Sequence, residues 1–422
     1  MKKFIYTMVV LAFAVTLNAQ WITISPSGTS DIHDISFVDA NTGFAAGEGG
    51  GKGIILKTTT GGTSWTTVYT TSLNSDWVKS IHFVNVNTGF ACSSGGFVYS
   101  TTNGGISWSS QSLTDDGLEC IRFINQSTGL TCGDNTSNTD RGPTFKTTNG
   151  GANWIKVNNS IYHMDFIQYI DASTVYASGD YVIYKSTNGG TSWTDIYPYN
   201  HDCNAVCFIN ENTGFVCGNF TMIKTTNAGE NWSDFLLSSS DTNYYSSVYF
   251  TDANTGYISM IRISDYAGRI YKTTNTGGNW NLQTNLNGYA NTIKFINSNT
   301  GFACGGGDKI WKTTNGGVSV QNISTEIPSS YSLGQNYPNP FNPSTKIRFE
   351  VMRSPTGTFG TDMVTLVVYD VMGREVQTLV NERLQPGIYE TTFNGEGLSS
   401  GIYFYRMRAG GYTETKRMML IR

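Results

Sequence analysis

The chain has 422 residues, a formal net charge of −4 and a charged fraction of only 14%. Its 47 Gly, 24 Tyr, 22 Phe and 9 Trp combine turn formers with β-favouring aromatic residues, a mixture typical of all-β proteins with many short strands. Residues 20–330 are acidic and would repel a phosphate backbone, so we expect no nucleic-acid partner.

The chain begins with the features of an export signal. Lys2 and Lys3 precede an apolar run over 4–16, and the sequence Leu-Asn-Ala follows at 17–19. This order predicts a signal peptide over residues 1–19. The apolar run is too short for a permanent membrane span, and no later stretch approaches the required length. We therefore expect no transmembrane segment after signal removal.

One repeat then recurs seven times. Its first half is Asn-Thr-Gly-Phe or a variant, starting at Asn41, Asn87, Ser127, Ser173, Asn212, Asn254 and Asn299. Its second half is a Lys-Thr-Thr-Asn-Gly-Gly-x-x-Trp segment or a variant, at 57–65, 100–108, 146–154, 185–193, 224–232, 272–280 and 312–320. Successive Trp residues lie 43, 46, 39, 39 and 48 residues apart. This period fits four short strands, which make one propeller blade.

The second copy illustrates the four strands, which we name A to D in chain order. Strand A is expected at 81–84, strand B at 89–92, strand C at 98–101, and strand D from Trp108 onward. The Asn103-Gly104 pair between strands C and D supplies the positive φ of a tight hairpin turn. The A–B and C–D turns are therefore expected on one face of the ring, and the D–A and B–C loops on the other.

The two ends of the array predict how the ring closes. The seventh copy carries Val320 where the others carry Trp, and residues 21–24 resemble a strand D without its blade. We expect residues 21–24 to pair with strand C of the last blade, near 310–313, because closure removes two exposed sheet edges.

The C–D segment resembles the Asp-box, or BNR, repeat. Residues 186–193 fit Ser-x-Asp-x-Gly-x-x-Trp, with Asn188 in place of Asp. The resemblance is greatest to the photosystem II assembly-factor-like group and looser to sialidase and xyloglucanase propellers. It implies a seven-bladed β-propeller over 20–325. It also implies a structural hairpin away from any active site, with the polar residue bonded to its own turn.

The character of the chain changes after a linker at 326–332. Residues 333–345 read LGQNYPNPFNPST, and VVYDVMGREV and LSSGIYFY follow at 367–376 and 398–405. Alternating residues and tight turns predict a small Ig-like β-sandwich over 333–422. The motifs resemble the type A C-terminal sorting domain of the type IX (Por) secretion system. That resemblance implies a partner in the type IX machinery. It also implies export through the periplasm and outer membrane of a Gram-negative bacterium, to the cell surface or the medium.

Neither metals nor cofactors are expected. Four of the seven Cys residues occupy one strand-B position, where other copies carry Ala or Ser, as small core residues do. Cys120, Cys203 and Cys207 leave a local disulfide open, and His201 with the last two is a weak metal pattern. The acidic stretch 134–140 lacks the Gly and Glu of a calcium loop.

The divergent D–A and B–C loops are the expected binding face, because identical turns serve the scaffold. The loop aromatics Trp77, Tyr199, His201 and Tyr245 are the predicted ligand contacts, with carbohydrate or a surface protein as ligand. A polar strand-A position differs in every copy and lines either the channel or the blade interfaces. Its residues are Ser36, His82, Arg122, Gln168, Cys207, Tyr249 and Lys294.

No catalytic residues are assigned, and the sequence favours a binding protein over an enzyme. The propeller has only four Arg and no sialidase-type motif. The alternative is an Asp-box glycoside hydrolase, which needs a pair of carboxylates across a cleft. Asp76, Asp116, Asp202 and Asp241 could supply such a pair.

Overall fold

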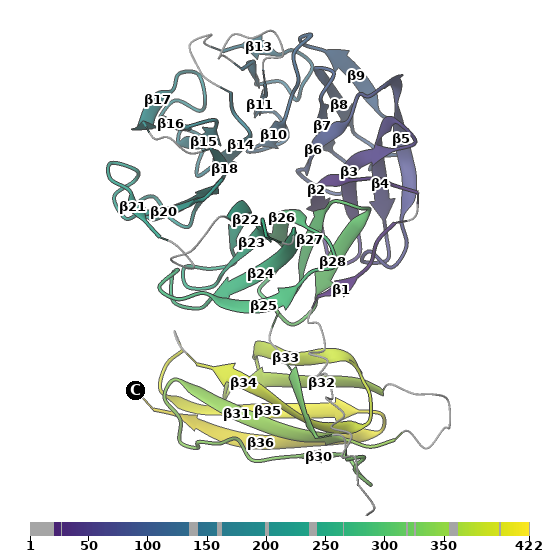
Figure 1. Cartoon of the computed structure of the whole chain (residues 1–422), viewed down its shortest axis with the longest axis vertical. Helices are drawn as coiled ribbons and strands as arrows, with labels where there is room; N and C mark the ends of the chain where they lie inside the picture. Colours follow the sequence, from purple (N-terminus) through teal and green to yellow (C-terminus); the bar gives the residue numbers. More distant parts are fainter. Residues whose placement is uncertain are drawn as a thin grey trace, which may run out of the picture. The chain divides into compact units, whose positions relative to one another are not determined.

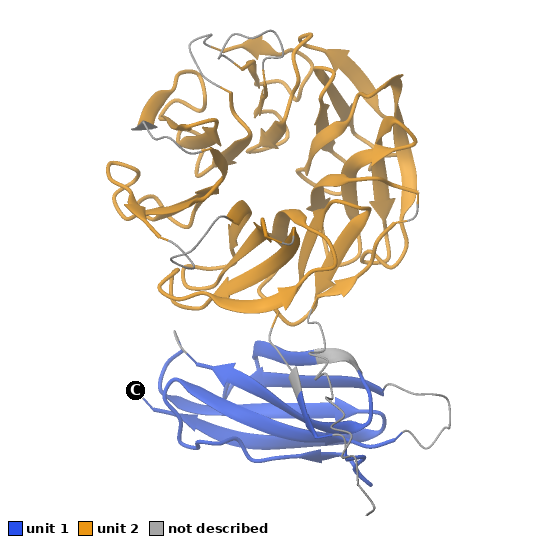
Figure 2. Ribbon diagram, in the orientation of Figure 1, with its two compact units in different colours: residues 1–20, 318–422 blue, residues 21–317 orange. Residues whose placement is uncertain are grey.

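The computed structural model describes residues 21–26, 28–134, 142–157, 163–198, 202–235, 243–264, 266–317, 320–324, 326–353, 362–395 and 398–421. Within these ranges every regular element is a strand, and no helix is long and apolar enough to span a membrane. The chain divides into two compact units, Trp21–Gly317 and the part from Val318 onward (Figure 2). The predicted signal peptide at 1–19 lies outside the described residues.

The first unit is a ring of four-stranded antiparallel sheets, seven of them within the described residues (Figure 1). Blades one to three comprise β2 (Ile32–Phe37), β3 (Gly43–Gly49), β4 (Lys52–Thr58), β5 (Thr66–Asn74); β6 (Val78–Phe83), β7 (Gly89–Ser93), β8 (Phe97–Thr101), β9 (Ser109–Ser112); and β10 (Cys120–Phe123), β11 (Gly129–Cys132), β12 (Thr144–Thr147), β13 (Ile155–Lys156). Blades four to six comprise β14 (Phe166–Tyr169), β15 (Val175–Gly179), β16 (Val182–Ser186), β17 (Thr194–Pro198); β18 (Cys203–Phe208), β19 (Gly214–Gly218), β20 (Thr221–Thr225), β21 (Ser233–Asp234); and β22 (Asn243–Phe250), β23 (Gly256–Arg262), β24 (Ala267–Thr273), β25 (Asn281–Asn285). The strands predicted as A to D follow one another outward from the centre, so the propeller prediction is confirmed.

The seventh blade is completed by the N-terminal strand. It consists of β26 (Ala290–Phe295), β27 (Gly301–Gly305), β28 (Lys309–Thr313) and β1 (Ile22–Thr23). Ile22 pairs with Lys312 and Thr23 with Trp311, as the repeat pattern predicts. Trp21 is 2% exposed and meets Phe295 edge-to-face at 5.8 Å. It therefore takes the place of the Trp that the last repeat lacks.

Adjacent blades are joined by aromatic stacking. The last residue of strand A in one blade stacks on an aromatic residue of strand B in the preceding blade, with centroid distances of 3.6–4.5 Å. The pairs are Phe37–Phe302, Phe83–Phe44, Phe123–Phe90, Phe208–Tyr176, Phe250–Phe215 and Phe295–Tyr257. Such buried pairs add to the burial of apolar area, which explains why the repeat carries an aromatic residue at both positions, with Leu130 of blade three as an exception.

The Asp-box turns fix each hairpin and connect it to its neighbour. In the second blade Asn103 Oδ1 accepts hydrogen bonds from Thr101 Oγ1 at 2.9 Å and Ser107 N at 3.0 Å. The repeat Lys reaches the turn of the next blade, as Lys312 does when it donates to Gly61 O at 2.8 Å across the closure. The expected structural role of the box is thus visible in its own contacts.

The second unit is a β-sandwich with a single core. One sheet contains β30 (Ser332–Leu333), β31 (Ser344–Val351), β34 (Gly387–Asn394) and β29 (Val320–Ser324); the other contains β33 (Glu375–Leu384), β32 (Asp362–Tyr369), β35 (Gly401–Ala409) and β36 (Tyr412–Leu420). The core lies between them and includes Phe349, Leu366 and Tyr405. In the PNPFNPST segment Phe341 is buried, and Thr345 Oγ1 donates to Pro338 O at 2.7 Å.

The position of β29 differs from the expectation that the propeller extends to residue 325. Residues Val320–Ser324 pair with β34 of the sandwich, and the propeller unit ends at Gly317. The reason is that β1 already occupies the free edge of β28. The segment that would have been a fourth strand is released to the second unit.

All seven Cys residues are buried. Cys92, Cys132, Cys217 and Cys304 lie in strand B, where the repeat placed them as core residues. Cys203 and Cys207 pack in two different core clusters. The two thiols therefore do not converge on a common metal, and His201 lies outside the described residues.

Candidate functional site

The polar strand-A position lines the centre of the ring. A cavity of about 630 Å³ lies there, within the circle of β2, β6, β10, β14, β18, β22 and β26 in Figure 1. It is lined by all seven residues of that position, namely Ser36, His82, Arg122, Gln168, Cys207, Tyr249 and Lys294. Of the two placements left open by the sequence, the channel is the observed one.

Several of these side chains also bridge blades. Strand A is the innermost strand of its sheet. Its backbone N–H and C=O groups on the side away from strand B therefore need hydrogen-bond partners from outside the sheet. Ser36 Oγ accepts from Phe83 N at 3.0 Å, and Gln168 bonds both the N–H and the carbonyl of Phe208 at 2.7 and 3.1 Å. Tyr249 OH donates to Phe295 O at 3.0 Å. Polarity at this position is therefore partly structural.

A charged group departs from this pattern. Asp34, which precedes the polar position by two residues in β2, accepts hydrogen bonds from Ser80 Oγ at 2.9 Å and Ile81 N at 3.1 Å. Arg122 of blade three lies 3.2 Å from its carboxylate, and Lys294 of blade seven is hydrogen-bonded to it. One carboxylate thus faces two cations, so the group formed by Asp34, Arg122 and Lys294 carries an excess positive charge. The other carboxylate in the cavity lining, Asp252, belongs to the turn at the end of the cavity.

The two cations shift the pKa values of the groups beside them, while burial lowers the pKa of Lys294 itself. Burial would raise the pKa of Asp34, but the charges of Lys294 and Arg122 outweigh burial and lower that pKa to about 2. Burial and then the charges of Arg122 and Lys294 lower the pKa of His82 to about 3. His82 is therefore neutral near pH 7 and does not cancel or add to the excess charge.

The channel cavity lies toward the A–B turns. Its lining includes the ends of strands A and the turn residues Ile124, Ile209, Thr251, Asp252 and Ala253. These turns are built alike in every blade, by an Asp or Asn side chain that accepts two backbone N–H bonds, as Asn85 does at 2.9 Å. The face expected to serve only as scaffold thus carries the mouth of the cavity.

The structure describes two of the four predicted contact residues, Trp77 and Tyr245, and places them differently. Tyr245 is 0% exposed and packs in a core cluster with Met222 and Met260, so the expectation that it is a surface contact is wrong. It falls within β22, whose inward positions alternate toward the core. Trp77 is half-buried on the D–A side, where its backbone N–H donates to Ser94 Oγ at 2.8 Å. Tyr199 and His201 lie outside the described residues.

The acids considered for a hydrolase are bound to the scaffold where they are described. Asp76 is 3% exposed and accepts hydrogen bonds from Tyr99 OH at 2.7 Å and Gly95 N at 2.9 Å. Asp202 accepts from Asn219, and Asp116 from Thr114 at 3.3 Å. Asp241 lies outside the described residues. The bonds of Asp76 account for its burial without a catalytic role.

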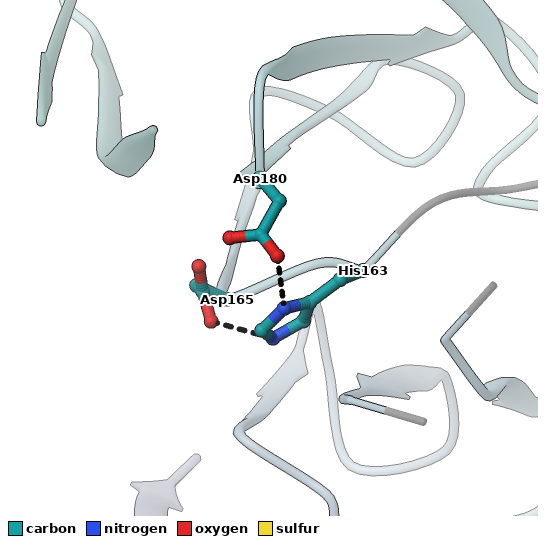
Figure 3. Close-up of side chains that lie close together, drawn as sticks. All are labelled: His163, Asp165 and Asp180. Atoms are coloured by element: carbon teal, nitrogen blue, oxygen red, sulfur yellow. Dashed lines mark hydrogen bonds and ion pairs between the residues drawn. The ribbon is translucent and has the colours of Figure 1, made fainter. Parts of the chain in front are cut away.

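A histidine clamp lies on the D–A and B–C face (Figure 3). His163 Nε2 is 2.8 Å from Asp165 Oδ1, and its Nδ1 is 3.1 Å from Asp180 Oδ2. Burial would lower the pKa of His163, but hydrogen bonds and charges from Asp165 and Asp180 raise it to about 10. The residue is therefore an imidazolium that ties a D–A loop to a B–C turn.

The same three residues are the group of possible metal ligands within the described part of the chain. Their geometry suits a proton better than a metal, since the two carboxylates approach opposite ring nitrogens. A metal ion needs its donor atoms to converge on one point.

Sequence reasoning missed the bonds of Asp34 to other blades and the pairing of His163 with Asp165 and Asp180. Asp34 lies one residue before a core position, and its partners Arg122 and Lys294 are 88 and 260 residues away. A usable signal was present, because an Asp inside a buried strand requires a cation or several N–H donors.

Comparisons with known proteins agree with this architecture. Residues 335–421 match the family described as secretion system C-terminal sorting domain. Residues 13–182 match the family described as photosynthesis system II assembly factor YCF48. None of the curated proteins compared with the chain matches it.

Solved structures share the fold at low identity. A structure of YCF48 bound to a D1 peptide has a TM-score of 0.58 and 19% identity, covering 71% of this chain and 99% of that chain. YCF48 from Cyanidioschyzon merolae gives 0.55 and 17%, covering 69% and 98%. PorZ, a surface component of the type IX secretion system of Porphyromonas gingivalis, gives 0.53 and 12%, covering 93% and 60%.

The chain thus combines a YCF48-like BNR propeller with a C-terminal sorting domain. The sorting domain marks it for export through the type IX secretion system, to the cell surface or the extracellular space.

Proposed function

We propose that the exported protein is a binding protein whose propeller receives a carboxylate-bearing polypeptide segment in its central channel. The observation that carries the proposal is the pairing of one buried carboxylate, Asp34, with two cations, Arg122 and Lys294. A buried excess charge is costly unless it is compensated. An anionic group entering the cavity supplies that compensation.

The walls of the cavity favour a polypeptide over a small inorganic anion. Its volume of about 630 Å³ is in the range of ligand pockets. Aromatic residues such as Phe166 and Phe250 lie beside the polar ring, which suits a segment that combines a charge with apolar side chains. The structure of YCF48 bound to a D1 peptide supports the proposal, since that propeller has the same fold and holds a peptide.

The test adds a fixed carboxylate to the channel. In Ser36→Asp the new side chain can still accept the hydrogen bond of Phe83 N, now made by Ser36 Oγ at 3.0 Å. It neutralises the excess charge, whereas Ser112→Asp places the same charge on the exposed strand β9 as a control.

The full mature chain and both variants would be applied to arrayed peptides with free or amidated C-termini and with or without Asp and Glu. We expect binding that depends on a carboxylate, about tenfold weaker in Ser36→Asp and unchanged in Ser112→Asp. Equal binding by Ser36→Asp and the natural protein would place the ligand elsewhere. Binding indifferent to peptide carboxylates would exclude the proposed chemistry.

A further inference from the structure

In six blades, the described residue directly before strand C has a left-handed backbone conformation, with positive φ. It is glycine in blades one and two, Gly51 and Gly96, both with φ of 77°. Aspartate occupies it in blade seven, as Asp308 with φ of 60°. This conformation needs no special explanation at glycine, because glycine has no Cβ to collide with the backbone.

Blades four, five and six place large aromatic residues at the same position. Tyr181, Phe220 and Tyr266 have φ of 58°, 60° and 52°. A bulky residue with positive φ is an outlier, since its Cβ crowds the backbone. Three outliers of one chemical class in three consecutive blades indicate a shared reason for the aromatic ring.

Packing does not supply that reason. Tyr181 is 56% exposed, Phe220 40% and Tyr266 71%, so each of the three residues presents a large part of its surface to solvent. Phe220 is the least exposed of them because its ring contacts Tyr244, with ring centroids 5.3 Å apart. Exposed apolar rings that strain the backbone and gain little burial are characteristic of binding surfaces.

The polar groups around the rings indicate the chemistry of the ligand. Asp180 precedes Tyr181, and its side chain is 50% exposed while it pairs with His163. Asn219 precedes Phe220; it donates to Asp202 of the D–A loop and accepts from Asn204 of β18. A ring face beside a fixed carboxylate or amide matches a pyranose, which presents a C–H face and hydroxyl groups together.

Two further features narrow the chemical class of the ligand. The rings stand one to a blade, separated by polar residues, and so present successive platforms instead of the continuous apolar core of a protein interface. Beside Tyr181, the carboxylates Asp134, Asp165 and Asp180 outnumber the one imidazolium, His163, and would repel an acidic polymer there. The hairpin of Tyr266 carries Arg262 and Arg269 instead.

We infer that Tyr181, Phe220 and Tyr266 form a binding surface for a neutral oligosaccharide chain on the D–A and B–C face. This surface is separate from the central channel, and the inference does not depend on the proposed carboxylate ligand. It retains the face predicted from the sequence but assigns it different residues.

The test uses glycine, the residue that blades one and two already carry there. The triple variant Tyr181→Gly, Phe220→Gly and Tyr266→Gly removes the rings and relieves the backbone strain together. Asp308→Gly relieves the same strain without removing a ring, and so is the matched control. The full mature protein and both variants would be run in affinity electrophoresis through β-glucan, xylan or mannan, with alginate as the acidic comparison.

We expect at least one neutral polysaccharide to retard the natural protein and Asp308→Gly, and alginate to retard neither. The triple variant should bind at least tenfold more weakly, with an unchanged or higher melting temperature. Absence of retardation by all three neutral polymers, or equal retardation of the triple variant, would overturn the inference. A lower melting temperature in the triple variant would assign the rings to the scaffold instead. Ser36→Asp should bind the polysaccharide normally, so failure of the channel proposal can be told apart from failure of this one.

Discussion

At the A–B end of each blade, one Asp or Asn side chain closes the turn in the same way seven times among the described residues. At the B–C end, the residue before strand C is glycine, proline, tyrosine, phenylalanine or aspartate according to the blade. The uniform end contacts neighbouring blades through stacked rings and Lys–Gly bonds, as Phe44 and Lys57 do. The variable end also contacts neighbouring blades through its backbone, as when Phe220 N donates to Asn243 O at 3.0 Å and Asp308 N to Ser30 O at 2.6 Å. Such backbone bonds leave the side chains free to differ.

Uniform turns nevertheless do not make a face inert. The channel cavity is lined by A–B turn residues such as Ile209 and Asp252, while its charged residues come from a position that varies around the ring. Function can thus reside on the uniform face, provided that it uses the inward side chains and not the turns. Repetition of the sequence identifies individual scaffold residues. It does not show that the whole face carrying those residues lacks a function.

Isolating the ring is the largest change we propose. A chain that ends at Gly317 keeps β1 and β28 paired and removes all of the second unit, including β29. In a host with type IX secretion we expect this chain to fold but to stay in the periplasm, as measured by cell fractionation. Normal surface delivery would contradict the export role of residues 333–422.

Substitutions of two tryptophans compare how much each end of the blades contributes to stability. Trp21→Ala removes a buried ring from the closing strand and should lower the free energy of unfolding by about 3–5 kcal/mol. Trp77→Ala, at the half-buried D–A position, should cost clearly less. Urea denaturation of both variants checks this order, and equal losses would remove the distinction between closure and rim.

A smaller effect is expected from pH at the channel. The folded pKa of His82, about 3, lies below its ordinary value of 6.5, so the unfolded chain binds the proton more readily. The contribution to stability is complete above pH 6.5 and is lost as pH falls toward 3, by about 1.4 kcal/mol per pH unit at most. Thermal melts from pH 7 to 4 should show a shallower decline for His82→Leu. Parallel curves would show that His82 is not held neutral by burial.

The smallest change concerns one bond at the closure. Lys312 Nζ donates to Gly61 O at 2.8 Å and lies 5.4 Å from the centre of the Phe302 ring. Lys312→Met should lower the free energy of unfolding by about 1 kcal/mol. Lys52→Met is the control at the other end, where the exposed amine donates to Ser72 O at 3.2 Å. A cost for Lys52 as large as that for Lys312 would break the comparison.

The sequence predicted the ring and its closure because a repeat reports its own periodicity. Trp21 could be assigned to the last blade because Val320 left one Trp position empty. The aromatic contacts were harder to predict, because adjacent residues in a strand point to opposite sides and the loop boundary decides which are buried. Tyr245 was expected in a loop, whereas β22 begins at Asn243 and carries Tyr245 into the core.

Long-range charge pairs were beyond prediction for a different reason. Asp34, Arg122 and Lys294 belong to three blades, and their meeting depends on how the ring curves. The left-handed backbone at Tyr181, Phe220 and Tyr266 could not be predicted either, because the sequence around an aromatic turn residue carries no signal for a positive φ.

The most direct test of the excess positive charge is the response of His82 to a carboxylate. Among the His residues that the structure describes, it alone lines the channel beside Arg122 and Lys294. Side-chain ¹⁵N NMR of histidine-labelled protein, assigned with His82→Leu, would follow its pKa with and without a peptide that binds. The account predicts a neutral ring in the free protein and a higher pKa when the carboxylate enters, because a nearby negative charge favours the imidazolium. An ordinary pKa near 6.5 in the free protein, or no change on binding, would contradict it.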